Sequence, residues 1–224
     1  MKLSIIIPVY NEAKNISALL RRLRDYRFQG HEVIVVDGGS RDNSFDCVIG
    51  LVDKLLMSKQ GRALQMNIGA EQAEGDILLF LHADTHLPKD ADKLIANVIE
   101  KDKVWGRFDV NLSGSHVFFR IIETMMNLRS CISGIATGDQ AIFVKRKAFE
   151  AVGGYPEMML MEDIELSKKL KSISKPVCIK QRVITSSRKW EQNGIVRTTL
   201  LMWRLRLQYF FGVSADKLHS KYYR

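Results

Sequence analysis

Residues 75–85, which read GDILLFLHADT, decide which fold class is open to this chain. The apolar run over 77–81 follows a Gly-Asp turn signal and ends abruptly in polar residues, as in a strand buried on both faces. Such a strand belongs in the middle of a mainly parallel sheet that helices cover. We therefore expect an α/β domain whose ligands bind at the carboxyl ends of the strands.

Two polar side chains, His82 and Asp84, come directly after this strand. They are two positions apart, so they project to the same side where the extended geometry continues. A carboxylate and an imidazole at a strand tip suit a divalent metal ion that holds a phosphate-bearing ligand. The alternative interpretation is structural, with a turn-forming aspartate beside a histidine that only packs.

Two earlier apolar runs predict further central strands. Residues 3–9 read LSIIIPV and are followed by apolar residues at helical spacing, so they predict the first half of a βαβ unit. Residues 32–37 read EVIVVD, a second buried strand that ends in Asp37. Because the carboxyl ends of parallel strands share an edge, we expect Asp37 on the same edge as Asp84. Asp37 is also a candidate helix-capping turn residue.

The rest of the chain continues the alternation of strands and helices. It predicts, in order, a helix capped by Ser40 or Asp42, a strand over 54–58, helices from 60 and after Pro88, a strand over 104–110, a helix between 115 and 130, a glycine-rich loop over 134–140, a strand over 141–144, helices over 145–152 and from 161, a short strand over 176–180, a polar stretch over 186–190 and a helix over 195–211.

Two helix starts carry charges that bear on function. Arg62 lies in a first helical turn, where a cation opposes the helix dipole, so it indicates either an anionic partner or a solvated arginine. Glu162 and Asp163 open a later helix and match its dipole, which a purely structural role explains. Two adjacent acids at a helix start are equally well placed to point into a pocket.

The composition limits the class of protein but does not identify a ligand. The chain has 224 residues, of which 46% are hydrophobic and 26% charged, as in an ordinary globular domain. The three cysteines are far apart and form no CxxC pair, which favours a reducing, cytoplasmic compartment. The net charge of +9 suits an anionic small ligand, a nucleic acid or an anionic membrane surface. The sequence shows neither a signal-peptide core nor an apolar run near the roughly 18 residues that span a bilayer.

The helix expected over 195–211 has a wider apolar arc than one sheet face needs. Its apolar stripe includes Trp203, Leu207 and Phe210. Packing against the core, pairing of two chains into a homodimer, and lying on a membrane surface all fit this pattern.

Five motifs in order resemble family 2 glycosyltransferases, over residues 3 to about 190. They are Pro8-Val9-Tyr10-Asn11-Glu12, Val35-Val36-Asp37-Gly38-Gly39-Ser40 with Asp42, Gly61-Arg62 with Asn67, His82-Ala83-Asp84, and Glu162-Asp163. The spellings LHADT, GDQ, LMED and SSRKW are similar to those of a small, soluble bacterial subgroup. The resemblance implies a single Rossmann-like nucleotide-diphospho-sugar transferase domain over 1–190, with residues 191–224 as an amphipathic helix and tail packed on it.

This resemblance also implies a UDP- or GDP-linked sugar donor lying across the strand tips. The residues that would hold its nucleotide are Pro8, Tyr10, Glu12, Asp37, Arg62 and Ala83. Asp84, with His82, would bind Mn²⁺ or Mg²⁺, which stabilises the charge that develops on the departing diphosphate.

The remaining implied roles concern the acceptor. Asp163 would be the general base that takes the proton from the acceptor hydroxyl in a single, inverting displacement, and Glu162 its less favoured neighbour. Asp139 and Gln140 would face the donor or acceptor sugar. Arg188 and Trp190 would lie near the diphosphate or the acceptor.

Two departures from the family pattern matter. The usual Asp-x-Asp is His82-Ala83-Asp84 here, and since Mg²⁺ prefers oxygen ligands, this favours Mn²⁺. The glutamine-x-x-arginine-tryptophan signature of processive synthases is absent, so transfer of one sugar is expected. The acceptor stays open; a lipid or membrane-proximal acceptor, with peripheral contact at the inner membrane face, fits the basic charge and the last helix.

Three other function classes compete with this assignment. A nucleotidyltransferase would have a glycine- and arginine-rich loop after the first strand, where this chain has Tyr10-Asn11-Glu12. A nucleic-acid-binding module would cluster its basic residues with exposed aromatics, whereas here they are dispersed over helix faces. A non-catalytic nucleotide-binding protein is the third alternative, and no nucleic-acid partner is expected.

Overall fold

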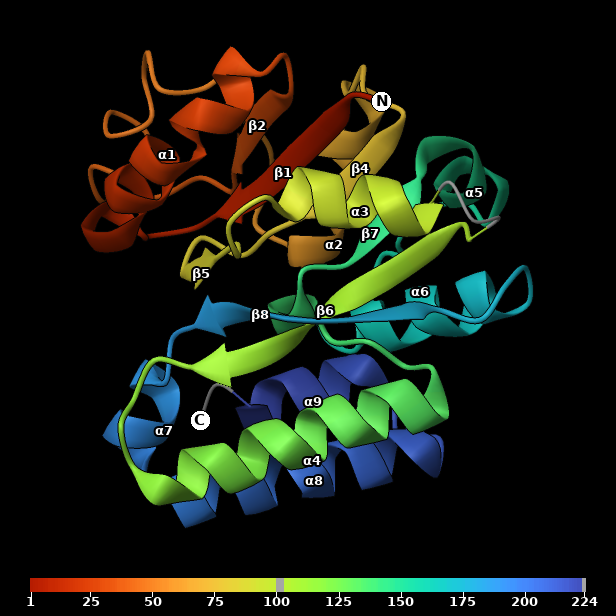
Figure 1. The fold of residues 1–224 in the computed structure, drawn as a ribbon. Helices are drawn as coiled ribbons and strands as arrows, with labels where there is room; N and C mark the ends of the chain where they lie inside the picture. Colours follow the sequence, from red (N-terminus) through yellow and green to blue (C-terminus); the bar gives the residue numbers. More distant parts are fainter. Residues whose placement is uncertain (100–102, 223–224) are drawn as a thin grey trace.

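The computed structural model describes residues 1–99 and 103–222, and within them eight strands form one sheet in the order β3-β2-β1-β4-β7-β6-β8-β5 (Figure 1). The strands are β1 (Leu3–Val9), β2 (Glu32–Asp37), β3 (Lys54–Met57), β4 (Ile77–Phe80), β5 (Thr85–His86), β6 (Trp105–Leu112), β7 (Phe143–Lys145) and β8 (Val177–Thr185). The expected α/β class is confirmed.

The first half of the sheet is parallel. β2 pairs with β1 and β3, and β1 pairs with β4, all in parallel, so the carboxyl ends of β1, β2 and β4 meet at one edge. Val9 and Asp37 are register partners at this edge. The second half is mixed: β7 is antiparallel to both β4 and β6, whereas β6 and β8 are parallel and β5 pairs antiparallel with β8.

Helices cover both faces of the sheet. The helical segments are α1 (Ala13–Phe28), α2 (Arg62–Glu71), α3 (Ala91–Ile99), α4 (Val117–Ser133), the single 3₁₀ turn η1 (Gly138–Gln140), α5 (Arg146–Ala151), α6 (Glu162–Lys171), α7 (Arg188–Asn193), α8 (Ile195–Phe210) and α9 (Ala215–Tyr222). A hydrophobic core lies on each face of the sheet. Alternate residues of β1 belong to different cores, because successive side chains along a strand point to opposite faces. Ile5 and Ile7 pack with α1 and α3, and Ile6 packs with α2, α5 and α6.

The central strands are buried on both sides, as their uninterrupted apolar runs predict. Every residue of β2 and of β4 is buried. On α2 the small residue Gly69 allows close approach to the sheet, since a Cβ there would lie 2.5 Å from Ile6 Cγ2.

The C-terminal helices lie at the end of the molecule away from α1 and α2, where α4, α8 and α9 gather (Figure 1). Leu205 of α8 and Leu218 of α9 are buried against Met161 and Ile164 at the start of α6. Trp190 of α7 belongs to one buried cluster with Leu112 of β6 and Phe119 of α4. Residues 191–224, as far as the structure describes them, thus extend the fold around α4 and α6.

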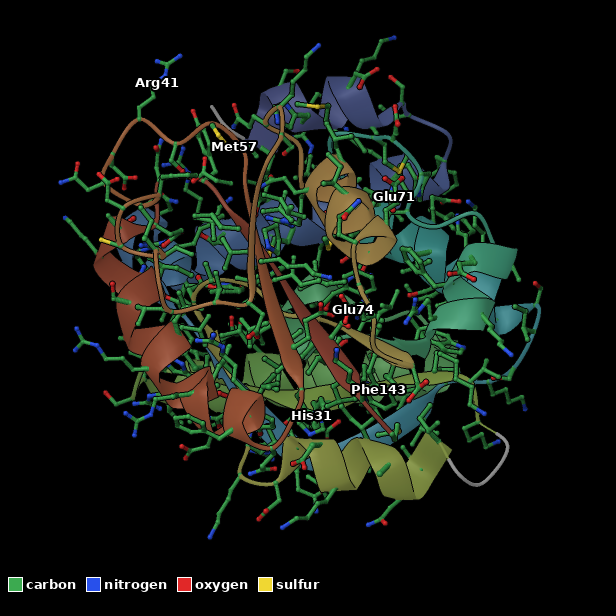
Figure 2. All side chains as sticks on the ribbon, turned by 90° about the horizontal axis from the view of Figure 1, so that it is seen from above. His31, Arg41, Met57, Glu71, Glu74 and Phe143 are labelled. Atoms are coloured by element: carbon green, nitrogen blue, oxygen red, sulfur yellow. The ribbon has the colours of Figure 1, made fainter. Side chains whose placement is uncertain are left out.

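Several sequence-based boundaries differ from the structure. The helix expected after Ser40 or Asp42 is wrong: residues 41–53 form turns, and Asp42 instead accepts hydrogen bonds from Ala13 N and Ser44 N. In the same segment Arg41 points outward from its loop (Figure 2). The polar stretch over 186–190 contains the start of α7, and the strand expected over 176–180 continues to Thr185.

Within residues 1–99 and 103–222, no helix combines the length and the apolar character needed to cross a bilayer.

Candidate active site

The loops that follow β1 and β2 are tied together at the parallel edge of the sheet. Asn11 N donates to Ser40 Oγ over 2.9 Å, and Arg41 N donates to Asn11 Oδ1 over 2.8 Å. Glu12 N donates to Ser44 Oγ over 2.7 Å. These bonds fix the backbone of both loops beside the tip of β4.

Asp37 caps the turn after β2 and keeps one oxygen unused. Its Oδ1 accepts hydrogen bonds from Gly39 N at 2.8 Å and Ser40 N at 2.7 Å, so Asp37 stabilises the turn, but no helix follows this turn. Its Oδ2 is buried and has no hydrogen-bond partner among the described residues. A buried acceptor of this kind is costly unless a ligand donates to it.

A cavity of about 470 Å³ opens beyond the tip of β4, between the strand ends and the helices α4, α6 and α8. Of the predicted site residues it is lined by Arg62, His82, Asp84, Asp139, Glu162, Asp163 and Trp190. The others lie outside this lining: Pro8, Tyr10, Glu12, Asp37, Ala83, Gln140 and Arg188. The acids at 84 and 163 therefore converge on one cavity, whereas Asp37 stands at the neighbouring strand tip.

The carboxyl group of Asp84 has other carboxyl groups near it. Burial raises its pKa, and the carboxylates of Glu12 and Asp139 raise it further, against the opposite effect of the Arg188 guanidinium. Crowding of carboxylates around a buried acid favours a bound cation, because a cation offsets both the repulsion and the lost hydration.

His82 is held neutral beside Asp84. Burial lowers the pKa of its imidazole to about 3, with a further contribution from the Arg62 charge. Its Nε2 is buried and has no hydrogen-bond partner among the described residues. The ring packs closely against Gly138, where a Cβ would lie 2.7 Å from His82 Cε1.

Asp163 is oriented by two backbone groups. Gly138 N donates to its Oδ2 over 2.9 Å and Ile164 N donates to its Oδ1 over 2.8 Å. The neighbouring Glu162 is buried, and its Oε1 lies 3.4 Å from Arg62 Nη1. Burial raises the pKa of Glu162, Arg62 opposes this shift, and the charge of Asp163 adds to it.

The two predicted site residues of the η1 turn, Asp139 and Gln140, have different roles. Gln140 is fully buried and accepts from Thr137 N at 3.2 Å in a capping box, so its side chain holds the turn. Asp139 faces the cavity, and burial together with the charge of Asp163 raises its pKa. Its Oδ1 is buried without a hydrogen-bond partner in the described residues.

The helix α7 places Arg188 and Trp190 on different sides. Arg188 Nη2 donates to Glu12 Oε1 over 3.1 Å and joins α7 to the loop after β1. Trp190 is buried and lines the cavity.

Sequence reasoning missed several residues of this site. Arg129 of α4, Lys189 of α7 and Arg206 of α8 line the cavity, as does an apolar wall that includes Met202 and Trp203. A signal for Arg206 exists in the sequence: it lies three and four residues after Trp203 and Met202, inside the apolar arc of its helix. Gln65 was also missed; its Nε2 donates to Val9 O and Val36 O, both at 2.8 Å.

The residues present fit a divalent metal ion with few protein ligands. Among residues 1–99 and 103–222, no group of three or more His, Cys, Asp or Glu side chains is arranged to hold a metal. Mg²⁺ and its analogues are commonly bound by one or two carboxylates plus the phosphates of a substrate. Asp84 supplies such a carboxylate in a setting that favours a cation, and neutral His82 is a competent second ligand.

Comparison with protein families gives a match over most of the chain. The model described as "Glycosyl transferase family 2" matches residues 4–153. An undecaprenyl-phosphate 4-deoxy-4-formamido-L-arabinose transferase of Yersinia pestis is 30% identical over 139 residues, covering 57% of this chain and 42% of that protein. An uncharacterized glycosyltransferase of Haemophilus influenzae is 33% identical over 95 residues, covering 39% of this chain and 38% of that protein. The matches thus span less than half the length of these relatives.

Solved structures share the fold. The mannosyltransferase PcManGT from Pyrobaculum calidifontis, in complex with GDP-Man and Mn²⁺, aligns with a TM-score of 0.67 at 21% identity and covers 99% of this chain and 69% of that one. S. aureus TarS 1–349, in complex with UDP-GlcNAc, aligns with a TM-score of 0.67 at 20% identity and covers 84% of this chain and 59% of that one.

Proposed function

The chain belongs to glycosyl transferase family 2, and from this we propose that it transfers one sugar from a nucleoside-diphosphate sugar to an acceptor hydroxyl, with inversion and with the help of Mn²⁺ or Mg²⁺. The observation that carries the proposal is the convergence of Asp84 and Asp163 on one cavity, from a strand tip and from the start of α6. A cation site and a base facing one space are what a displacement at an anomeric carbon requires.

The donor nucleotide would lie over the tips of β1, β2 and β4. The proposed contacts are Pro8, Tyr10, Glu12, Asp37, Arg62 and Ala83. In support, the unpartnered Asp37 Oδ2 offers an acceptor for a ribose or base donor group. The hydrogen-bonded loops at Asn11 and Ser40 form a fixed backbone rim beside it. UDP-GlcNAc in TarS and GDP-Man in PcManGT are ligands of the same fold.

Asp84 would hold the metal ion, with His82 as a second ligand and the donor diphosphate as the rest of its shell. When bound, the ion supplies charge stabilisation for the departing diphosphate. Arg62 also lines the cavity and can place a further positive charge beside the diphosphate. The Mn²⁺ in the PcManGT complex is consistent with this choice of metal.

Asp163 would act as the general base. The acceptor oxygen attacks the anomeric carbon, the bond from that carbon to the diphosphate oxygen breaks, and its electron pair leaves with the nucleoside diphosphate. The hydroxyl proton goes to the Asp163 carboxylate, which backbone N–H bonds from Gly138 and Ile164 hold in place. Glu162 is the weaker candidate because it is buried beside Arg62.

The acceptor side of the cavity would be formed by Asp139 and Trp190, with Gln140 and Arg188 supporting the turn and the loop that shape it. The apolar wall from α4 and α8 favours a lipid or membrane-proximal acceptor, and the Yersinia relative carries an undecaprenyl phosphate in its name. Residues 191–224 would then serve as an acceptor-binding unit packed on the catalytic domain over 1–190, with peripheral membrane contact.

The test is a screen of UDP- and GDP-linked sugars for Mn²⁺-dependent hydrolysis or transfer, with Asp163→Asn as the diagnostic variant. We expect Asp163→Asn to reduce turnover by about 10²–10⁴-fold, the usual contribution of a positioned base, with the donor Kd nearly unchanged. Turnover of Asp163→Asn at the level of the parent protein would remove Asp163 as the base. Absence of turnover and binding with every sugar nucleotide would refute the function itself.

A further inference from the structure

Two arginines from different helices line the cavity. Arg129 lies on α4 and Arg206 on α8, and both line the cavity on the side away from β4. Both side chains are half-buried. In the part of the chain that the structure describes, neither makes an ion pair within 4.0 Å, and Arg129 Nη2 is buried without any hydrogen-bond partner.

These cations are not accounted for by the acids around them. Asp139 and Asp163 are their electrostatic neighbours and raise the pKa of both arginines. However, both oxygens of Asp163 already accept backbone N–H groups, and Asp139 Oδ1 stays unpartnered. Burial and the mutual repulsion of the two guanidinium groups lower the pKa of Arg129 to about 10. A half-buried guanidinium group that lacks a close hydrogen-bonded partner is costly, so the pair suits an anion that arrives with a ligand.

The surroundings of the pair are apolar. Met125 and Met126 of α4 and Met202 and Trp203 of α8 line the same cavity. Trp203 is also 53% exposed and Met125 45% exposed, so the apolar wall continues to the surface between the two helices. Further exposed apolar side chains follow the same helices: Ile121, Leu128 and Ile132 on α4, and Leu200, Leu207 and Phe210 on α8. The cavity thus has positive charge at its inner end and apolar side chains where it opens to the surface. This arrangement fits an amphiphilic ligand.

We propose that Arg129 and Arg206 bind the phosphate of an amphiphilic acceptor, whose hydrocarbon chain leaves the cavity between α4 and α8. This assignment rests on the proposed function, because it names the acceptor class of that same site. The phosphate anchors the molecule and takes no part in bond breaking. The accepting hydroxyl belongs to the same head group, and Asp163 takes its proton. The planar guanidinium fork suits a phosphate because it can donate two parallel hydrogen bonds.

The test measures binding to the chain of 224 residues by isothermal titration calorimetry, with dodecyl phosphate as the probe. Dodecyl maltoside supplies the same chain without an anion, and inorganic phosphate supplies the anion without a chain. We expect dodecyl phosphate to bind at least about tenfold more tightly than either control. Arg129→Gln and Arg206→Gln should each weaken it by about tenfold or more, without changing the Kd for UDP or GDP with Mn²⁺.

A matched control is Arg204→Gln, which removes an exposed arginine of the same helix that lies outside the cavity lining. It should leave dodecyl phosphate affinity unchanged. If Arg206→Gln does not fold, Arg206→Lys keeps the charge without the fork and should weaken binding several-fold.

Three results would overturn the proposal: equal affinity for dodecyl phosphate and dodecyl maltoside, unchanged affinity in Arg129→Gln and Arg206→Gln, or loss of nucleotide binding in these variants while dodecyl phosphate still binds. The last result would assign the arginines to the donor. Arginine-dependent binding of dodecyl phosphate by a protein that binds no nucleotide with Mn²⁺ would refute the proposed function and leave this binding site standing.

Discussion

Substituting Gly138 by alanine tests whether the strand tip and the start of α6 form one site. Gly138 stands between them: its N–H donates to Asp163 Oδ2, and its Cα packs against the His82 ring. Its φ is outside the left-handed region, so alanine brings no backbone strain. A Cβ at this position would lie 2.7 Å from His82 Cε1 and nearer still to Nε2, whereas an ordinary contact is at least 3.4 Å.

The overlap at Cε1 is therefore 0.7 Å, the difference between these two distances. The His82 ring is partly buried and lines the cavity, so either this ring or the η1 loop must move to relieve the overlap. Overpacking of this kind costs about 1–3 kcal/mol. For a chain of this length, a loss of about 2 kcal/mol lowers the melting temperature by roughly 4–8 °C. Movement of η1 also displaces the donor that orients Asp163, so we expect kcat to fall by about 10–10²-fold.

The assay combines thermal unfolding with steady-state kinetics on Gly138→Ala, His82→Ala and the double variant. Removing the imidazole relieves the overlap, so the stability losses should be clearly less than additive in the double variant. The reasoning is wrong if Gly138→Ala melts within about 1 °C of the parent protein and keeps its kcat. Additive losses would show that the overlap lies elsewhere.

Three further results follow from the geometry. A metal binds the ionised form of Asp84, whose pKa is raised, so Mn²⁺ affinity should fall at a higher pH than it would for an aspartate with the ordinary pKa of 3.8. Calorimetry at several pH values checks this, and affinity that stays constant down to about pH 4 contradicts it. Gln65→Ala removes two buried hydrogen bonds to the carbonyls at the ends of β1 and β2, so the free energy of unfolding in urea should fall by about 1–3 kcal/mol. A fall below about 0.5 kcal/mol would show that these bonds do not stabilise the edge of the sheet. Arg188→Gln breaks an ion pair with Glu12 in which the arginine is 47% exposed, so a thermal melt should show a loss below about 1 kcal/mol, and a loss above about 2 kcal/mol would mean that α7 depends on this pair.

The parallel half of the fold could be predicted because its signals are local. β1, β2 and β4 are apolar runs bounded by turn residues, and such runs place their polar successors at one edge. This is why the sequence could place Asp84 at this edge, where it lines the cavity; its role as a metal ligand stays a proposal. The convergence of Asp163 on the same cavity depended on the family resemblance, since no local pattern relates a helix start to a strand 80 residues earlier.

The rest could not be predicted because it depends on pairings between distant residues. The antiparallel placement of β7 beside β4 and β6 has no signature within β7 itself. Ser40 and Asp42 have the chemistry of helix caps, but their side chains bind the loop after β1. Arg206 was missed because α8 is apolar over a wide arc, so the sequence does not tell which face turns inward.

The most direct test of the account is the affinity for UDP and GDP, with and without Mn²⁺, in the parent protein and in Asp84→Asn. We expect Mn²⁺ to tighten nucleoside-diphosphate binding by about tenfold or more in the parent protein, and Asp84→Asn to abolish this gain while keeping the metal-free affinity. The same affinity with and without Mn²⁺, or a metal effect that survives in Asp84→Asn, would contradict it.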